Sequence, residues 1–175
     1  RRVTGLCNRI EAKHIDGIVE LVPTFASLTV FYDCTIINSK KLKKKVEALI
    51  NVGECDVKST AKVWNIPVCY DDEFALDMKN VCSHTALERE EVIKLHTSKP
   101  YLIYMLGFLP GFAYLGGMDE RLFTPRLKTP RLEIFEGAVG IGGEQTGIYP
   151  IASPGGWQLI GKTPVKVFDK SKESP

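Results

Sequence analysis

The stretch Tyr101-Leu-Ile-Tyr-Met-Leu-Gly-Phe-Leu-Pro-Gly-Phe-Ala-Tyr-Leu-Gly-Gly117 decides the fold of this chain. It opens with an apolar run, and glycines, a proline and aromatic residues follow in quick succession. The same alternation of short apolar runs with Gly or Pro continues to the C-terminus. This pattern is typical of a β-barrel or a strongly bent sheet. We therefore expect residues 101–175 to form a β domain.

The sequence before residue 101 has the periodicity of mixed helix and sheet. Val3, Leu6, Cys7 and Ile10 make one helical stripe, and a second apolar stripe follows Asn38-Ser39 until Gly53. Between them, residues 18–22 and 27–32 are short β-rich runs, and residues 62–70 predict a further strand that Pro67 interrupts. The fold class is therefore α+β, with a small α/β layer domain over residues 1–70.

Residues 71–100 predict a helical connector of two short helices. The second begins at Thr85-Ala-Leu-Glu88, a capping box in which Thr85 and Glu88 bond to each other's backbone. His96 stands at the end of this helix, where a lone histidine more often caps the last carbonyls than acts as a base.

Composition excludes several classes of protein. The chain has 175 residues, 44% of them hydrophobic, with a net charge of +2, which is too small to argue for nucleic-acid binding. The lysines around residue 43 predict a solvated helix face, because no aromatic residues interleave with them. Five scattered cysteines fit reduced thiols, not a disulfide framework or a zinc site. With no long apolar run and no signal-peptide layout, we expect a cytoplasmic protein with no metal site.

Several segments together resemble the allophanate hydrolase subunit 1 family. They are residues 101–117, Thr124-Pro-Arg126, Thr129-Pro-Arg131, residues 137–150 and 153–164, and further upstream residues 20–33, 66–70 and 91–96. This family includes the B-type subunit of the bacterial 5-oxoprolinase, KipI-type inhibitors and part of urea carboxylase. The resemblance implies a cyclophilin-like barrel over residues 101–175. The family pattern has a further strand at each end, which predicts that the chain is trimmed.

The resemblance implies a component of an ATP-dependent hydrolase that opens the lactam of 5-oxoproline to glutamate. Its partners would be an allophanate hydrolase subunit 2-like protein, which is the C-type subunit of that enzyme, and a LamB/YcsF-like protein, which is the A-type subunit. ATP with Mg would bind at the level of the assembled complex, and this chain would be inactive alone. The alternatives are a KipI-type inhibitor of a sporulation histidine kinase and an allophanate hydrolase or urea carboxylase-like subunit.

Aromatic residues on turns are candidates for a dry pocket wall. Gly111 suits a type II turn and would hold Phe112 and Tyr114 on a stiff loop, although these rings equally suit a core plug. Ser153-Pro-Gly-Gly-Trp157 delivers Trp157 to the start of a strand, and Ser153 is a candidate pocket residue. Ser153 is not in a G-x-S-x-G motif, so no nucleophilic triad is predicted and the catalytic residues stay unknown.

Arg126 and Arg131 are candidates for a clamp on a substrate carboxylate. Proline precedes each arginine and restricts its backbone, and a planar guanidinium binds carboxylates bidentately. In the alternative interpretation both are surface arginines paired with neighbouring acidic residues: Asp119, Glu120 or Glu133.

The glycine-rich segment of residues 140–147 predicts an anion site. Gly142, Gly143 and Glu144 would form a backbone nest, and Gln145 and Thr146 would add side-chain hydrogen bonds to substrate. The alternative is a bulge in a barrel strand. If the segment is a site, Gln145 should lie in a pocket that also touches the loop of residues 108–117.

Overall fold

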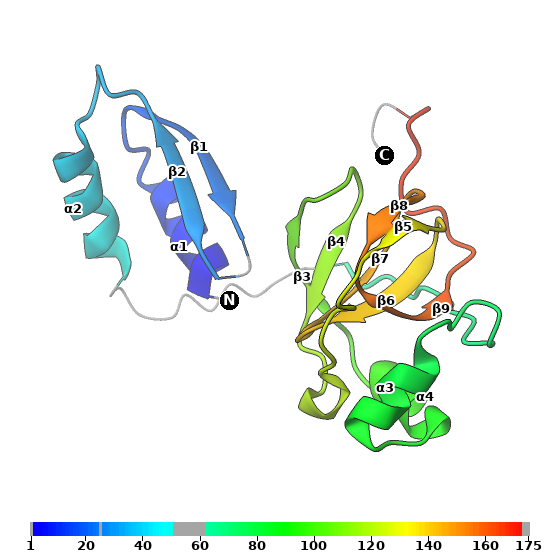
Figure 1. Ribbon diagram of the computed structural model, residues 1–175. Helices are drawn as coiled ribbons and strands as arrows, with labels where there is room; N and C mark the ends of the chain where they lie inside the picture. The colour runs from blue at the N-terminus through cyan, green and yellow to red at the C-terminus, as the bar shows by residue number, and fades with distance from the viewer. Residues whose placement is uncertain (1, 25, 51–61, 173–175) are drawn as a thin grey trace. The chain divides into compact units, whose positions relative to one another are not determined.

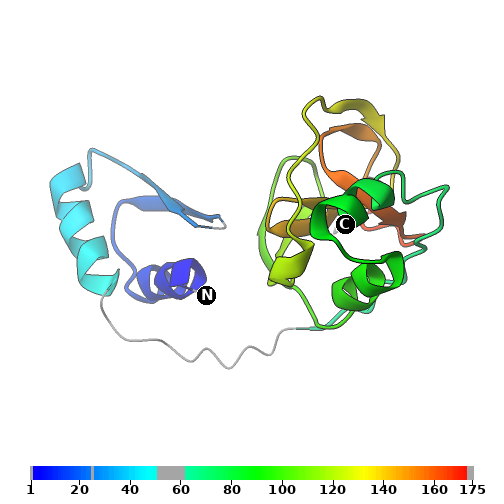
Figure 2. The ribbon, with the colours of Figure 1, turned by 60° about the horizontal axis from the view of Figure 1, so that its bottom comes forward.

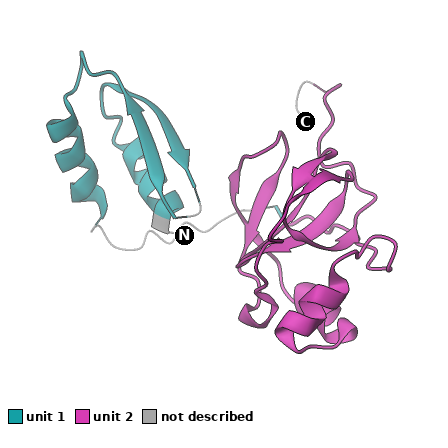
Figure 3. Ribbon diagram, viewed as in Figure 1, with its two compact units in different colours: residues 1–62 teal, residues 63–175 magenta. Residues whose placement is uncertain are grey.

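The computed structural model describes residues 2–24, 26–50 and 62–172, and the chain divides into two compact units. Unit 1 comprises residues 1–62 and unit 2 comprises residues 63–175 (Figure 3). The predicted domain boundaries at residues 70 and 100 stay predictions.

Unit 1 is a β-hairpin with two helices. Its elements in chain order are α1 (Arg2–Ala12), β1 (Ile18–Pro23), β2 (Leu28–Tyr32) and α2 (Ser39–Ile50) (Figure 1). β1 pairs antiparallel with β2, and α1 packs against α2 and β1. The apolar stripes of the helices supply buried residues, among them Cys7, Ile10, Leu42 and Leu49. The two helices and two strands predicted from periodicity are confirmed.

Unit 2 is built on antiparallel sheets. Its larger sheet has the order β3-β4-β7-β6-β9, and a second sheet pairs β5 with β8. The strands are β3 (Leu102–Leu106), β4 (Ala113–Gly116), β5 (Arg131–Ile134), β6 (Ala138–Gly142), β7 (Gln145–Ile148), β8 (Ser153–Gly155) and β9 (Gln158–Lys162). The predicted α+β class is confirmed. Within the described part of the chain neither sheet closes on itself, so the cyclophilin-like barrel stays a prediction.

Helices α3 (Met78–Thr85) and α4 (Arg89–His96) pack beside the larger sheet, as the turned view shows (Figure 2). The short helix η1 (Glu120–Leu122) contacts both of them. Val81 and Val92 of the helices share one buried cluster with Ile141 and Ile160 of the sheet. The helices predicted between residues 71 and 99 therefore belong to the core of unit 2.

The structure corrects the predicted start of α4. Thr85 is the last residue of α3, and its hydroxyl donates to the carbonyl of Val81 instead of capping α4. The capping box is formed by Glu88 and Glu91, because each side chain accepts the other residue's backbone N–H. A carboxylate takes the place of the expected threonine hydroxyl. Its negative charge also interacts favourably with the positive N-terminal end of the helix dipole.

The strand predicted over residues 62–70 is wrong. Within it, Cys69 alone makes a β-bridge, which joins it to Lys162. Pro67 has no N–H to donate to a ladder, and the side chains of Val63 and Trp64 are exposed. Apolar β-forming residues alone do not make a strand where no neighbouring strand accepts hydrogen bonds from their backbone.

No helix in the described ranges is long and apolar enough to cross a membrane.

Candidate functional site

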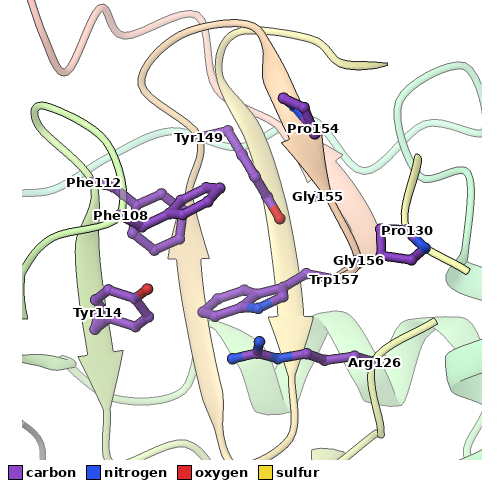
Figure 4. A pocket seen from close by; sticks show the side chains of 10 residues that line it. All are labelled: Phe108, Phe112, Tyr114, Arg126, Pro130, Tyr149, Pro154, Gly155, Gly156 and Trp157. Atoms are coloured by element: carbon purple, nitrogen blue, oxygen red, sulfur yellow. The ribbon is translucent and has the colours of Figure 1, made fainter. Parts of the chain in front are cut away.

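An aromatic cavity of about 270 Å³ lies on unit 2, and Figure 4 shows the side chains around it. Aromatic rings and turn residues make most of its wall. The residues that line it are Phe108, Phe112, Tyr114, Arg126, Pro130, Tyr149, Pro154, Gly155, Gly156 and Trp157. Of the predicted site residues, Phe112, Tyr114, Arg126 and Trp157 therefore come together here. We call this space the aromatic cavity.

Phe112 is the centre of the ring cluster. Its ring centroid lies 4.9 Å from that of Tyr114, 5.3 Å from that of Tyr149 and 5.5 Å from that of Trp157. All three contacts are edge-to-face, the geometry that the quadrupoles of aromatic rings favour. Phe112 is 1% exposed, so it supports the wall from behind. The two interpretations of this ring, pocket wall and core plug, both describe part of its role.

Trp157 lies against a floor of glycines on β6 and β7. A Cβ atom at Gly142 would come within 2.5 Å of the indole, and one at Gly147 would lie 3.0 Å from it. These distances leave no room for a side chain, so glycine is needed where the ring packs on the strands. The packing of one tryptophan therefore accounts for Gly142 and Gly147 of the glycine-rich segment.

Arg126 places a cation at the edge of this cavity. Its Cζ atom lies 5.7 Å from the centroid of the Trp157 ring, a cation–π contact that Figure 4 shows from the side. The backbone on both sides is fixed, because Gln158 Nε2 donates to the carbonyl of Pro125 at 2.9 Å and Leu127 N donates to that of Gly156 at 2.7 Å. Among the described residues no carboxylate lies within 4.0 Å of its guanidinium. Its donors are available for a ligand anion.

Tyr149 also lines the cavity, and the sequence did not indicate it. Its hydroxyl lies so near Gly155 that a Cβ atom there would come within 2.4 Å of it. Burial raises the pKa of Tyr149. The hydrogen bond from the backbone N–H of Trp157 lowers this pKa by a smaller amount. A neutral hydroxyl is the form that donates a hydrogen bond. The signal in the sequence is weak, because Tyr149 reads as one more apolar residue before Pro150.

Arg131 lies outside this cavity and is bound to Asp77. Its Nη1 and Nη2 donate to the two carboxylate oxygens of Asp77 at 2.9 and 2.7 Å. Asp77 also accepts the backbone N–H of Leu159 at 2.7 Å, and its side chain is 3% exposed. The pair joins β5 to the start of α3 and to β9. None of the partners considered from the sequence (Asp119, Glu120 and Glu133) is the one that binds Arg131.

Gly142 is the last residue of β6 and pairs with Gln145, and Gly143 and Glu144 form the turn between β6 and β7. Gly143 has φ +68°, which suits the first position of a two-residue hairpin turn. Its N–H donates to the carbonyl of Thr124 at 2.8 Å. Glu144 is exposed. The predicted anion nest is thus a hairpin turn in this structure, with the Gly143 donor already engaged by the chain itself.

Gln145, Thr146 and Ser153 do not line the aromatic cavity. Gln145 is half-buried at the start of β7, so the expectation that it shares a pocket with the loop of residues 108–117 is not met. Thr146 is buried and donates to the carbonyl of Gly140 at 2.9 Å. Ser153 is buried, and its Oγ has no hydrogen-bond partner in the described ranges.

His96 is a buried bridge, not a helix cap. Its Nδ1 lies 2.8 Å from the hydroxyl of Tyr70, and its Nε2 lies 2.9 Å from Oγ1 of Thr146. Burial lowers the pKa of His96 to about 4. The end of α4 is closed by Thr97, whose backbone N–H bonds to the carbonyls of Ile93 and Leu95. The predicted capping role of His96 is therefore wrong.

The chain matches known proteins over its whole length. The family model for the carboxyltransferase domain, subdomain C and D, matches residues 1–175. The chain is 49% identical to the B-type subunit of 5-oxoprolinase from Escherichia coli O157:H7, over all of this chain and 79% of the relative. It is 44% identical to the B-type subunit of 5-oxoprolinase from Bacillus subtilis (strain 168), over 95% of this chain and 73% of the relative.

Two solved structures share the fold. TTHA0988 superposes with a TM-score of 0.78 at 34% identity, over 100% of this chain and 34% of that chain. The urea carboxylase of Kluyveromyces lactis superposes with a TM-score of 0.76 at 25% identity, over 93% of this chain and 16% of that chain. The chain thus spans about a third of TTHA0988 and less of the urea carboxylase, while it spans most of the two bacterial relatives.

Proposed function

This chain belongs to the carboxyltransferase domain family, subdomain C and D, and from that premise we propose that it acts as the B-type subunit of an ATP-dependent 5-oxoprolinase. The observation that carries the proposal is its identity of 43–49% to three bacterial 5-oxoprolinase subunits of this type, over 90–100% of the chain. The urea amidolyases are 24–26% identical, and the chain spans 10–11% of their length. The contrast favours 5-oxoproline over urea as the substrate.

The aromatic cavity is the place we propose for the lactam. 5-Oxoproline is a small ring that carries one carboxylate, so it needs an apolar wall and one fixed cation. Trp157 and Tyr114 provide the wall, and the guanidinium of Arg126 provides the cation. A planar fork binds a carboxylate through two parallel hydrogen bonds, which fixes the orientation of the ring. The Tyr149 hydroxyl is a candidate donor to the lactam oxygen.

The cavity supplies binding and orientation, and we propose that partner subunits supply the rest of the chemistry. Its lining residues include two tyrosines and one arginine, and none is a carboxylate, histidine or cysteine. Water needs a general base to attack an amide at useful rates. We therefore assign the base and the ATP step to the allophanate hydrolase subunit 2-like and LamB/YcsF-like partners.

ATP with Mg does not fit the residues predicted as an anion site, Gly142, Gly143 and Glu144. Gly143 gives its N–H to Thr124, and Glu144 is a single exposed carboxylate. In the described part of the chain no cluster of three or more His, Cys, Asp or Glu residues is placed to hold a metal ion. We derive no step through ATP on this chain.

Reconstitution tests the proposal. The purified chain should release no glutamate from 5-oxoproline, with or without ATP and Mg, and should do so when both partner subunits are added. Allophanate and urea serve as control substrates of the same assembly. Turnover of 5-oxoproline by the single chain would contradict the proposal that partner subunits supply the catalytic groups. An assembly that turns over only allophanate would contradict the proposal that 5-oxoproline is the substrate.

A further inference from the structure

A second cavity of about 480 Å³ lies on unit 2, and no residue that lines it belongs to the aromatic cavity. Three segments meet in its wall, and backbone bonds hold them together. Cys69 and Lys162 exchange two hydrogen bonds of 2.8 Å, and Thr163 N donates to Gly137 O at 2.9 Å. The lining residues are Cys69, Phe74, Glu136, Gly137, Lys162, Thr163, Pro164, Val165 and Lys166. We call this space the lysine cavity.

Lys162 is held in place by two aromatic rings. Its Nζ atom lies 5.1 Å from the centroid of Phe74 and 5.2 Å from that of Phe135. The two rings pack edge-to-face, 6.2 Å apart. Among the described residues no carboxylate lies within 4.0 Å of this ammonium. Cation–π contacts position the charge and leave its N–H donors available to a ligand.

Two further charges share the lining with Lys162. Lys166 lies 3.6 Å from Asp169, and the lysine is exposed while the aspartate is half-buried. An ion pair at the surface contributes little to stability, so a ligand carboxylate can replace Asp169. Glu136 is exposed, and no ion pair within 4.0 Å joins it to either lysine. The lining therefore offers two ammonium groups, one carboxylate and an apolar surface that includes Phe74 and Val165.

We propose that the lysine cavity binds an acidic amino acid. Such a molecule carries two carboxylates and one ammonium, which is the charge complement of Lys162, Lys166 and Glu136. The α-ammonium would bind Glu136, and the two carboxylates would bind the lysines. The methylene groups between them would lie against Phe74 and Val165. Lysine side chains suit this site because each ligand carboxylate would pair with one ammonium group. The planar guanidinium of an arginine is not required for such a pair.

The binding claim rests on this cavity and does not depend on the function proposed above. If that function holds, glutamate is both the product of the lactam opening and a ligand of this class. The lysine cavity would then be a place where product binds away from the aromatic cavity. Its role would be regulation by product, because the two cavities share no residue.

Titration calorimetry on the purified chain tests the binding directly and requires no turnover. L-Glutamate is the probe, glutarate is the analogue without the ammonium, and L-glutamine is the analogue without the second carboxylate. We expect L-glutamate to bind at least about tenfold more tightly than either analogue. Equal binding of glutamate and glutarate would overturn the assignment of Glu136, and no binding of glutamate would overturn the site.

Variants of the three charges separate binding from folding. Lys166→Met changes an exposed side chain and should weaken L-glutamate about tenfold, as should Lys162→Met if that variant keeps its fold. Glu136→Gln should weaken L-glutamate and leave glutarate unchanged. Lys128→Met, at an exposed residue outside both cavities, is the matched control and should change nothing. Unchanged glutamate binding by both Lys166→Met and Glu136→Gln would overturn the proposal.

Discussion

The imidazole Nε2 of His96 lies 2.9 Å from Oγ1 of Thr146 and ties helix α4 to strand β7. Thr146 donates its one hydroxyl proton to the carbonyl of Gly140, so it must accept the proton of Nε2. Nδ1 then carries no proton and accepts from the hydroxyl of Tyr70. The chain of donors Tyr70, His96, Thr146 therefore fixes one neutral tautomer of a buried histidine.

Replacing Thr146 with valine should lower the free energy of unfolding. Valine keeps the shape of the side chain and removes the hydroxyl, which leaves the Nε2–H of His96 and the carbonyl of Gly140 without this partner. A buried donor or acceptor left unpaired costs about 1–3 kcal/mol. Urea unfolding followed by tryptophan fluorescence measures the loss. Thr129→Val, at an exposed position, is the control and should stay within about 0.5 kcal/mol of wild type.

Stability should fall as the pH drops from 6.5 toward 4. Burial holds the pKa of His96 at about 4 in the folded chain against 6.5 for an unperturbed histidine. In that window the unfolded state binds a proton that the folded state does not, so protons favour unfolding. The loss from this group is on the order of 3 kcal/mol. Thermal unfolding of wild type and His96→Gln across this range should show a smaller slope for the variant, and equal slopes would contradict the assignment.

Gly142→Ala should disrupt the packing of Trp157. The new Cβ atom would lie 2.5 Å from the indole, and overpacking of this kind costs about 1–3 kcal/mol. Gly156→Ala is the matched control, because its Cβ atom would meet its nearest neighbour at 3.6 Å, an ordinary contact. Urea unfolding should separate the two variants, and a shift of the tryptophan emission should accompany Gly142→Ala.

Periodicity predicted the elements of unit 1 because each helix and strand there shows its apolar stripe or run locally. The strand over residues 62–70 failed because a strand also needs a partner, and partners are set by tertiary structure. The same reason explains why the partner of Arg131 was not predicted. Its acidic neighbours in sequence were visible, but Asp77 comes to it across 54 positions through the packing of α3 against β9.

The sequence predicted four residues of the aromatic cavity and missed others. Aromatic residues on turns indicated Phe112, Tyr114 and Trp157, and proline before arginine indicated Arg126. Tyr149 lines the cavity too but carries only the signal of an apolar residue. Gln158, which lies outside the cavity lining and bonds to the carbonyl of Pro125 beside Arg126, carries no local signal. The glycines of residues 140–147 looked like an anion site because glycine at a close packing contact and glycine in a backbone nest have the same composition.

Arg131→Lys should lower stability without changing substrate binding. Lysine keeps the charge opposite Asp77 but loses one of the two parallel hydrogen bonds, at a cost of about 1–2 kcal/mol. Asp77→Ala should cost more, about 3–5 kcal/mol, because it leaves the guanidinium and the Leu159 N–H without their partner. In the reconstituted assembly the KM for 5-oxoproline should stay at its wild-type value for Arg131→Lys. A raised KM with unchanged stability would contradict this prediction and indicate that Arg131 binds the substrate.

Arg126→Lys tests the function of the aromatic cavity, and we expect the reverse of the result for Arg131→Lys: stability should be kept and substrate binding weakened. The side chain is exposed and has no carboxylate partner among the described residues, so stability should stay within about 0.5 kcal/mol of wild type. The loss of the planar fork should raise the KM for 5-oxoproline about tenfold in the reconstituted assembly. Arg121→Lys, which also replaces an exposed arginine but lies outside the cavity, is the matched control. If Arg126→Lys and Arg121→Lys give the same kinetics as wild type, then Arg126 does not bind the substrate, and another residue of the assembly holds the carboxylate.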